Sequence, residues 1–346
     1  MSGGHMAASL QQAASMVESA AAKLFDADPT IRSVGVGERD GDVGFVAVRN
    51  ALCAIPYYSP SAWRVAPEKI EDLRVEYVKE FADPRSLIEV PHTGPGSPQS
   101  VSTMPEVHRT RPLVCGLQIQ NFDDDSREGL LSRGTYRIGT LGCFVSVNGD
   151  IAILSNNHVG AGENRGKNGA DRILQEGGAQ FNSHLLAATL TDFVRLVESP
   201  NSATIATGNV NWNDADACVA KLSPGESHVQ GYLPIRNARP PTGSGDARPG
   251  DRVFKVGRTT GLTFGTVRQM AAIVPIEYSI GRCWFRNAVV IEGENGTTFS
   301  NPGDSGSAVV RESDGKVVGL VFAGGAVYTY ACPISAVLSG LNCILV

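Results

Sequence analysis

The stretch Asn301-Pro302-Gly303-Asp304-Ser305-Gly306-Ser307-Ala308-Val309-Val310 places a serine in a glycine-rich turn directly ahead of a β-branched strand. A serine hydroxyl is a poor nucleophile at neutral pH, so it needs a general base and donors for the oxyanion that it creates. We expect the backbone N–H groups of Gly303 and Ser305 to be these donors, because glycine lets a turn aim two of them at one point. An ordinary surface turn explains the same residues equally well. The choice between the two depends on partners elsewhere in the chain.

The general base is expected to be a histidine, and only one of the six histidines follows a strand pattern. His158 stands near the end of residues 151–159, where an apolar run leads into two asparagines. A loop histidine without a chemical role is the alternative. The other five lie in polar, turn-like or terminal stretches: His5, His92, His108, His184 and His228.

An orienting carboxylate must hold the imidazole in one tautomer and stabilise its protonated form. Asp216 is the preferred candidate, because it opens the apolar run 216–222 and is expected at a partly buried strand edge. Asp214, two residues earlier and on the same strand face, competes with it. A capping role explains either aspartate without catalysis. We therefore predict a catalytic set of Asp216, His158 and Ser305.

The chain order His158, Asp216, Ser305 is that of chymotrypsin, and it differs from the orders in subtilisin and the α/β-hydrolases. Residues 113–346 resemble the chymotrypsin/trypsin-fold serine proteases in four motifs, at residues 139–159, 216–222, 255–267 and 303–307. The motif at 255–267 looks like a hairpin shared by bacterial trypsin-like peptidases and the plant narrow-leaf proteases. The resemblance implies two antiparallel β-barrels, a triad in the cleft between them, and peptide-bond hydrolysis through an acyl-enzyme.

Two features of secreted trypsins are missing. Val159 and Asn301 stand where those enzymes have disulfide-forming cysteines, which agrees with a reducing compartment. Phe299, six residues before the nucleophile, stands where trypsin has an aspartate that binds Lys or Arg side chains. Trypsin-like specificity is therefore not expected.

Residues 319–325 resemble the substrate-binding wall of the family. With Phe299, we expect Phe322, Ala323 and Gly324 to form an uncharged pocket for an apolar or small side chain. Asp304 needs a cationic partner, for which Arg258 is the candidate.

The N-terminal part predicts a small α+β domain over residues 7–82. Apolar residues recur at spacings of 3 and 4 over residues 8–26, which predicts a helix. Residues 31–37 and 43–48 predict a hairpin around Asp40-Gly41, and residues 66–73 predict a short helix before a strand through Val75 and Tyr77.

Residues 83–112 contain six prolines and predict a linker, and residues 113–346 predict the protease-like domain. Strands are expected in that domain at residues 142–147, 151–154, 252–256, 288–291 and 316–322. Residues 333–341 predict a closing helix.

The composition excludes some classes of binding partner. The 346 residues carry a net charge of −5, which provides no basic field for a nucleic acid, and no apolar run is long enough to cross a membrane. The seven cysteines contain no CxxC pair, so we expect no metal site and no cofactor. We expect the cysteines to be reduced and to serve as packing residues, which predicts a cytoplasmic protein. The sequence is compatible with a homo-oligomer and does not decide the oligomeric state.

Three functions follow as hypotheses. The first is a serine endopeptidase that acts on a specific cytosolic protein. The second is a catalytically silent module of the same fold that binds a peptide or partner. The third is an autoprocessing protease that cleaves its own linker at residues 83–112.

Overall fold

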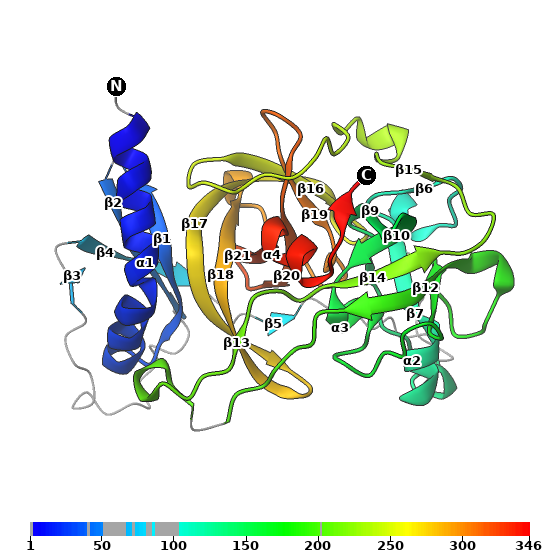
Figure 1. The fold of residues 1–346 in the computed structure, drawn as a ribbon, viewed down its shortest axis with the longest axis horizontal. Coiled ribbons are helices and arrows are strands. Elements are labelled where there is room, and N and C mark those ends of the chain that lie inside the picture. The colour runs from blue at the N-terminus through cyan, green and yellow to red at the C-terminus, as the bar shows by residue number, and fades with distance from the viewer. Residues whose placement is uncertain are drawn as a thin grey trace.

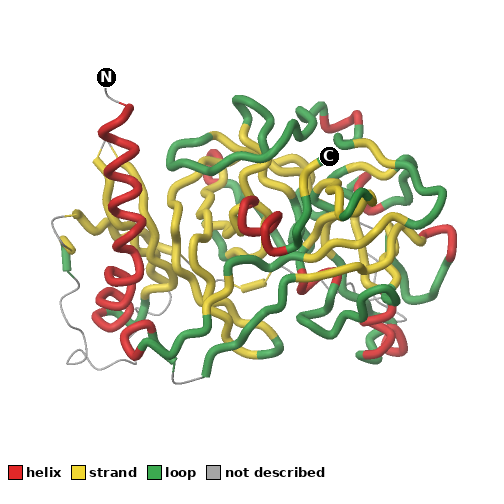
Figure 2. Tube along the Cα trace, viewed as in Figure 1, coloured by secondary structure: helices red, strands yellow, loops and turns green. Residues whose placement is uncertain are grey.

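The computed structural model describes residues 3–39, 42–50, 67–70, 73–80, 85–86, 104–200 and 203–346. Strands dominate these residues, and most of the helices are short (Figure 2). Figure 1 shows helix α1 and the first strands at one end, the long β17–β18 hairpin beside them, and the green strands of residues 143–222 toward the other end. The predicted fold class, mostly β with a small N-terminal α+β unit, is confirmed.

Eight strands of the described residues form one antiparallel sheet, in the order β22-β9-β10-β14-β12-β11-β7-β8. Their bounds are β7 Gln118–Asn121, β8 Gly139–Thr140, β9 Cys143–Val147, β10 Asp150–Ser155, β11 Arg172–Gln175, β12 Leu186–Phe193, β14 Cys218–Leu222 and β22 Ile344–Leu345. A separate two-stranded pair joins β6 Leu113–Val114 to β15 His228–Val229. The short helices α2 Phe122–Arg127 and α3 Asn157–Gly160 follow β7 and β10.

The larger sheet runs in the order β13-β18-β21-β20-β19-β16-β17 and then continues into the N-terminal strands. Its C-terminal members are β13 Trp212–Asn213, β16 Arg252–Gly257, β17 Gly261–Tyr278, β18 Gly281–Gly293, β19 Ala308–Arg311, β20 Val317–Gly324 and β21 Tyr328–Pro333. Helix α4 Ile334–Gly340 then leads back to β22 in the other sheet. The five strands predicted within residues 113–346 are therefore confirmed, two of them as β9 and β10 in the eight-stranded sheet and three within β16, β18 and β20 in the larger sheet, and α4 confirms the closing helix.

The N-terminal strands extend the larger sheet. β1 Ile31–Arg39 pairs antiparallel with β17, placing Val34 opposite Ile273 and Val36 opposite Met270. β2 Asp42–Asn50 follows β1 as the predicted hairpin, although Asp40 and Gly41 lie outside the described residues. The remaining strands are β3 Lys69–Ile70, β4 Leu73–Glu80 and β5 Arg85–Ser86.

Helix α1 Gly3–Ala27 confirms the predicted helix and begins five residues earlier. It packs its apolar face on this extension of the sheet, with Val17, Ala21 and Leu24 buried. The same cluster includes Trp284 of β18, so residues of the two parts of the chain share one core.

The short helix predicted over residues 66–73 is wrong in the described part of that segment. Lys69 and Ile70 instead pair antiparallel with Arg74 and Leu73. Ile70 and Leu73 are three positions apart, a spacing that suits one face of a helix but also the two ends of a tight hairpin. The strand predicted through Val75 and Tyr77 is confirmed as β4.

Part of the predicted linker, residues 83–112, lies outside the described residues. Within the described part, residues 85–86 form β5, and Pro105–Val107 form the 3-10 turn η3. Glu106 of this turn is fully buried and pairs with Arg236, at 2.6 Å between Oε2 and Nη2. This end of the segment is therefore anchored to the body of the molecule.

Candidate active site

His158 and Asp216 lie side by side because the strands that carry them are paired. β10 and β14 run antiparallel with Ser155 opposite Cys218, so the residues just after β10 meet those just before β14. His158 Nδ1 is 2.5 Å from Asp216 Oδ2, and the backbone N–H of His158 donates to Oδ1 at 3.2 Å. Both side chains are fully buried. The carboxylate therefore fixes the ring through Nδ1, and Nε2 has no hydrogen-bond partner among the described residues.

Tyr278, which the sequence analysis missed, is a further partner of this carboxylate. Its phenol donates to Asp216 Oδ2 at 2.7 Å. Burial, together with the negative charge of Asp216, raises the pKa of Tyr278 well above its ordinary value, so the phenol stays a donor. The backbone N–H of Asp216 is also held, by the sulfur of Cys332 at 3.2 Å. Asp216 is thus immobilised on both sides.

Asp214, the competing candidate, lies in a different environment. Its carboxylate is about half exposed and pairs with Arg286, at 2.8 Å between Oδ1 and Nε. The structure therefore places Asp216, and not Asp214, against the histidine.

The loop around Ser305 is held by the first sheet. Thr140, at the end of β8, donates two hydrogen bonds to this loop: its N–H donates to the Ser305 carbonyl at 2.8 Å, and its hydroxyl donates to the Gly303 carbonyl at 2.8 Å. Gly306 has φ of +93°, and a Cβ atom there would lie 2.2 Å from the Thr140 carbonyl oxygen. Only glycine fits this position, which explains why the serine is followed by one.

Contacts around Gly139 bring the Ser305 loop and the histidine region together. A Cβ atom on Gly139 would lie 2.5 Å from the Val159 side chain and 3.0 Å from the Ser305 carbonyl oxygen. The residue after His158 and the backbone of Ser305 therefore both touch the same short strand.

No hydrogen bond joins Ser305 to His158 among the described residues. The Ser305 hydroxyl donates to the Phe322 carbonyl at 3.4 Å, and His158 Nε2 is buried without a partner. Catalytic hydrogen bonds are often long or misaligned in enzymes without substrate. The geometry thus contains a carboxylate–imidazole pair and a neighbouring serine, not a closed three-residue chain.

Two backbone donors beside Ser305 are free within the part of the chain that the structure describes. Neither the N–H of Gly303 nor that of Ser305 donates a hydrogen bond there. Gly303 has φ of +98°, a conformation that favours glycine. These are the two N–H groups predicted to receive an oxyanion.

Asp304 anchors the same loop to the β16–β17 hairpin. Its fully buried carboxylate accepts from the backbone N–H groups of Thr259 and Asn301, both at 2.9 Å, and from the Thr260 hydroxyl at 2.7 Å. The cation that faces it is Lys255, with Nζ 3.5 Å from Oδ2.

The candidate cation, Arg258, makes other contacts. Its guanidinium donates to Gln118 at 2.8 Å and to the Thr259 hydroxyl at 3.2 Å. Lys255 was missed because a lysine between Phe254 and Val256 in a strand is usually exposed. The sequence signal that could have identified Lys255 was its place at the start of the motif at 255–267, because Thr259 and Thr260 of the same motif also contact Asp304.

Replacing Lys255 by methionine is expected to lower the free energy of unfolding by about 3 kcal/mol, because it leaves a buried carboxylate without its cation. Lys221, whose pair with Asp150 at 2.6 Å is more than half exposed, is the matched control. Lys221→Met should cost less than about 1 kcal/mol, since exposed ion pairs contribute little. Urea unfolding of the three proteins measures both, and equal effects would contradict the anchoring role of Lys255.

The four residues predicted to bind substrate are all buried. Phe299 lies in the core of the larger sheet, with its ring centroid 5.9 Å from Lys255 Nζ. Phe322 packs on Phe285 at 4.6 Å between ring centroids. Ala323 and Gly324 end β20, directly after Phe322, whose carbonyl accepts the Ser305 hydroxyl. Ser305 and His158 are themselves no more than 1% exposed, so the site is closed in this structure.

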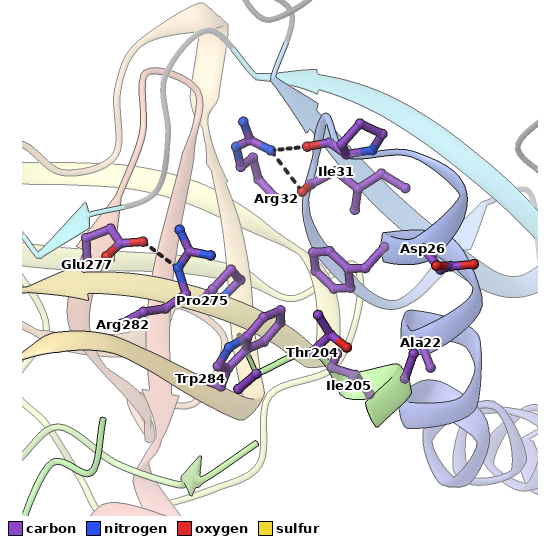
Figure 3. Close-up of a pocket in the computed structure, with 14 residues that line it drawn as sticks. Ala22, Asp26, Ile31, Arg32, Thr204, Ile205, Pro275, Glu277, Arg282 and Trp284 are labelled. Carbon is purple, nitrogen blue, oxygen red and sulfur yellow. Dashed lines mark hydrogen bonds and ion pairs between the residues drawn. The ribbon is translucent and has the colours of Figure 1, made fainter. Parts of the chain in front are cut away.

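A cavity of about 480 Å³ lies elsewhere, between helix α1 and the β17–β18 hairpin (Figure 3). Phe25 of the helix, Ile205 of the 3-10 turn η6 Ile205–Thr207, and Trp284 of β18 line it. None of the predicted triad residues does. The cavity belongs to the contact between the N-terminal unit and the larger sheet.

The described residues contain no group of three or more His, Cys, Asp or Glu side chains that is arranged to hold a metal ion. None of the described helices has the length and apolar character needed to span a membrane.

One comparison with known proteins matches the part of the chain that carries the β16–β17 hairpin and Ser305. Residues 246–330 match the Nal1 C-terminal domain. The rice (Oryza sativa subsp. japonica) Protein NARROW LEAF 1 is 41% identical over 79 residues, which span 22% of this chain and 13% of the rice protein. The resemblance to narrow-leaf proteins inferred from the motif at 255–267 is confirmed, and it covers this Nal1 C-terminal domain.

Solved serine proteases are similar to a longer part of the chain. A glutamic acid specific serine protease is 18% identical over 68% of this chain and 100% of its own, with a TM-score of 0.44. Nocardiopsis protease is 15% identical to this chain. The match covers 67% of this chain and 98% of the protease, with a TM-score of 0.43. Thermobifida fusca Protease A is 17% identical to this chain. The match covers 60% of this chain and 91% of Protease A, with a TM-score of 0.41. Activity must be argued from the site itself.

Proposed function

We propose that this protein is a serine endopeptidase that hydrolyses peptide bonds through an acyl-enzyme. The observation that carries the proposal is the buried pair of His158 and Asp216, 2.5 Å apart, with Nε2 of the imidazole left unsatisfied. An unsatisfied buried nitrogen is unfavourable by itself, and a serine hydroxyl that turns toward it satisfies it. Ser305 is the neighbouring hydroxyl, in a loop with two unused backbone donors.

In the proposed reaction, His158 Nε2 takes the proton of Ser305 as Oγ bonds to the substrate carbonyl carbon. The N–H groups of Gly303 and Ser305 stabilise the oxyanion. The imidazolium, held by Asp216, then gives its proton to the leaving amine and the peptide C–N bond breaks. Water, activated by the same imidazole, hydrolyses the ester and releases Ser305.

The substrate in this proposal is a protein or peptide with an apolar or small side chain at the cleavage site. The residues that support it are the uncharged Phe322, Ala323 and Gly324 at the end of β20. Phe299 lies in a separate hydrophobic cluster from Phe322 and Ala323 and is not part of this support. No cofactor takes part in these steps.

A cytoplasmic location is part of the same proposal. Six described cysteines are buried and unpaired, and burial raises the pKa of the Cys332 thiol well above its ordinary value. Such thiols are poor nucleophiles and serve as packing groups, as is usual in reducing compartments.

Labelling with a fluorophosphonate probe tests the proposal, because only an activated serine reacts stoichiometrically with it. Peptide mapping of the labelled protein should place the adduct on Ser305. A probe that labels another serine, or none after the site has been opened, would reject the peptidase assignment.

A silent binding module is the second candidate, and the burial of Ser305 and His158 favours it. It predicts peptide binding without labelling in any form of the protein. An autoprocessing protease remains a third candidate, which intact-mass measurement after prolonged incubation tests. An unchanged mass in a protein that labels at Ser305 would count against it.

A further inference from the structure

Several segments bond to one edge of β20, one after another along the strand. The last of them is β5, a strand from the N-terminal part of the chain. β19 and the nucleophile loop bond to β20 as far as Val321. The carbonyl of Phe322 accepts the Ser305 hydroxyl. The next residues, Ala323 and Gly324, pair antiparallel with β5. β5 thus occupies the part of the edge that follows the nucleophile.

This part of the edge directly follows Phe322, whose carbonyl accepts the Ser305 hydroxyl, so a peptide strand added here runs next to Ser305. A free strand edge offers a row of backbone N–H and C=O groups, and added peptides bind such edges as a further strand. The backbone of Arg85 and Ser86 already uses those groups.

β5 is also held from its other side. Arg85 pairs parallel with Glu277 of β17, the residue before Tyr278, whose hydroxyl donates to Asp216. β5 therefore lies between the strand that carries Phe322 and the strand that braces the carboxylate. In Figure 1 it is the short cyan arrow near the middle of the molecule.

A buried carboxylate from the N-terminal unit fixes the turn beside β5. Glu80, the last residue of β4, is fully buried and accepts hydrogen bonds from three backbone N–H groups at 2.9–3.1 Å: Ala326, Val327 and Tyr328. A Cβ atom on Gly325 would lie 2.6 Å from the same carboxylate. Charge-assisted hydrogen bonds of this kind are stronger than neutral ones, so Glu80 ties the N-terminal unit to the end of β20.

We propose that Arg85–Ser86 is an autoinhibitory strand that occupies the peptide-binding edge of β20, and that an extended substrate must displace it to reach Ser305. The inference rests on the proposed peptidase function and names how that site is regulated. It agrees with the closed state, in which Ser305 and His158 are no more than 1% exposed.

Two pairs of variants separate the strand from its surroundings. Ser86→Pro removes a backbone N–H from a strand that has a neighbour on both sides, and proline is excluded from such positions. Ser86→Ala is its control, because the pairing runs through the backbone. Glu80→Ala removes the carboxylate from the turn, and Glu76→Ala on the same strand removes one that pairs with the largely exposed Arg39.

The first measurement does not need catalysis. In a full-length Ser305→Ala background, a fluorescein-labelled peptide with the sequence of residues 83–90 is titrated by fluorescence anisotropy. We expect at least ten-fold tighter binding to the Ser86→Pro protein than to the Ser86→Ala protein, since the tethered strand competes at a high effective concentration. Glu80→Ala should shift the affinity in the same direction relative to Glu76→Ala. Unchanged affinities in both pairs would overturn the proposal.

The second measurement is the rate of fluorophosphonate labelling in proteins that keep Ser305. Ser86→Pro and Glu80→Ala should label at least ten-fold faster than their controls. Equal labelling of all five proteins, wild type included, would reject the autoinhibitory strand and keep the peptidase. Tighter peptide binding without labelling in any protein would keep the occluding strand and reject the peptidase.

Discussion

Replacing Ser305 by alanine is expected to lower peptide turnover by about a million-fold, the loss seen when the nucleophile of a serine triad is removed. Alanine keeps the backbone N–H, so the two donors at Gly303 and 305 stay in place and a small residual activity should remain. The hydroxyl makes one long hydrogen bond, at 3.4 Å to Phe322, and its loss should change the free energy of unfolding by no more than about 1 kcal/mol. Hydrolysis of a peptide library and urea unfolding measure the two effects.

Ser313→Ala is the matched control for this change, because Ser313 is exposed in the turn after β19. It should retain the wild-type rate within two-fold. A Ser305→Ala protein that still cleaves at the wild-type rate would remove the nucleophile from the proposed mechanism.

Replacing Asp216 by asparagine is expected to lower turnover by about ten thousand-fold. The asparagine amide presents a donor where His158 Nδ1–H and the Tyr278 hydroxyl both need an acceptor. The imidazole then takes the wrong tautomer, and Nε2 no longer accepts the serine proton. Turnover, measured by initial rates across pH, should fall without a comparable loss of folded protein.

Asp214→Asn is a stringent control, since it makes the same chemical change two residues away. Asp214 pairs with Arg286 at the surface, and its replacement should leave turnover within about two-fold, because exposed ion pairs contribute little. A larger effect at Asp214 than at Asp216 would contradict the proposed role of the buried carboxylate.

The contact between His158 and Asp216 was predictable because it depends on neighbouring strands with clear patterns. Each residue flanks an apolar run, and those runs pair as β10 and β14. The need for glycine at 303 was likewise predictable from the turn, and its φ of +98° agrees with it. The need for glycine at 306 was not predicted, because it depends on the contact with Thr140.

The partners that brace these residues were not predictable in the same way. Tyr278 reaches Asp216 from 62 positions away, and nothing in its local sequence marks it. Lys255 is buried against expectation because the negative charge of Asp304 faces it, and Arg258 has the same charge but different neighbours. Such choices depend on tertiary contacts that a local pattern does not contain.

Short segments were the other source of error. Residues such as Ile70 and Leu73 fit both a helical face and a two-residue hairpin, and only their position beside β2 and α1 decides between these structures. β5 is two residues long, within a proline-rich stretch, and its pairing with β20 has no sequence signal of its own.

The continuity of β1 with β17 has a practical consequence for truncated forms of this protein. A fragment that starts at residue 113 would uncover the part of the β17 edge, around Met270 and Ile273, where β1 now pairs, while the first residues of β17 stay paired with β16. Long uncovered edges recruit other chains, so such a fragment should be prone to self-association and should be handled as an aggregation hazard. Point substitutions in the intact chain avoid this problem.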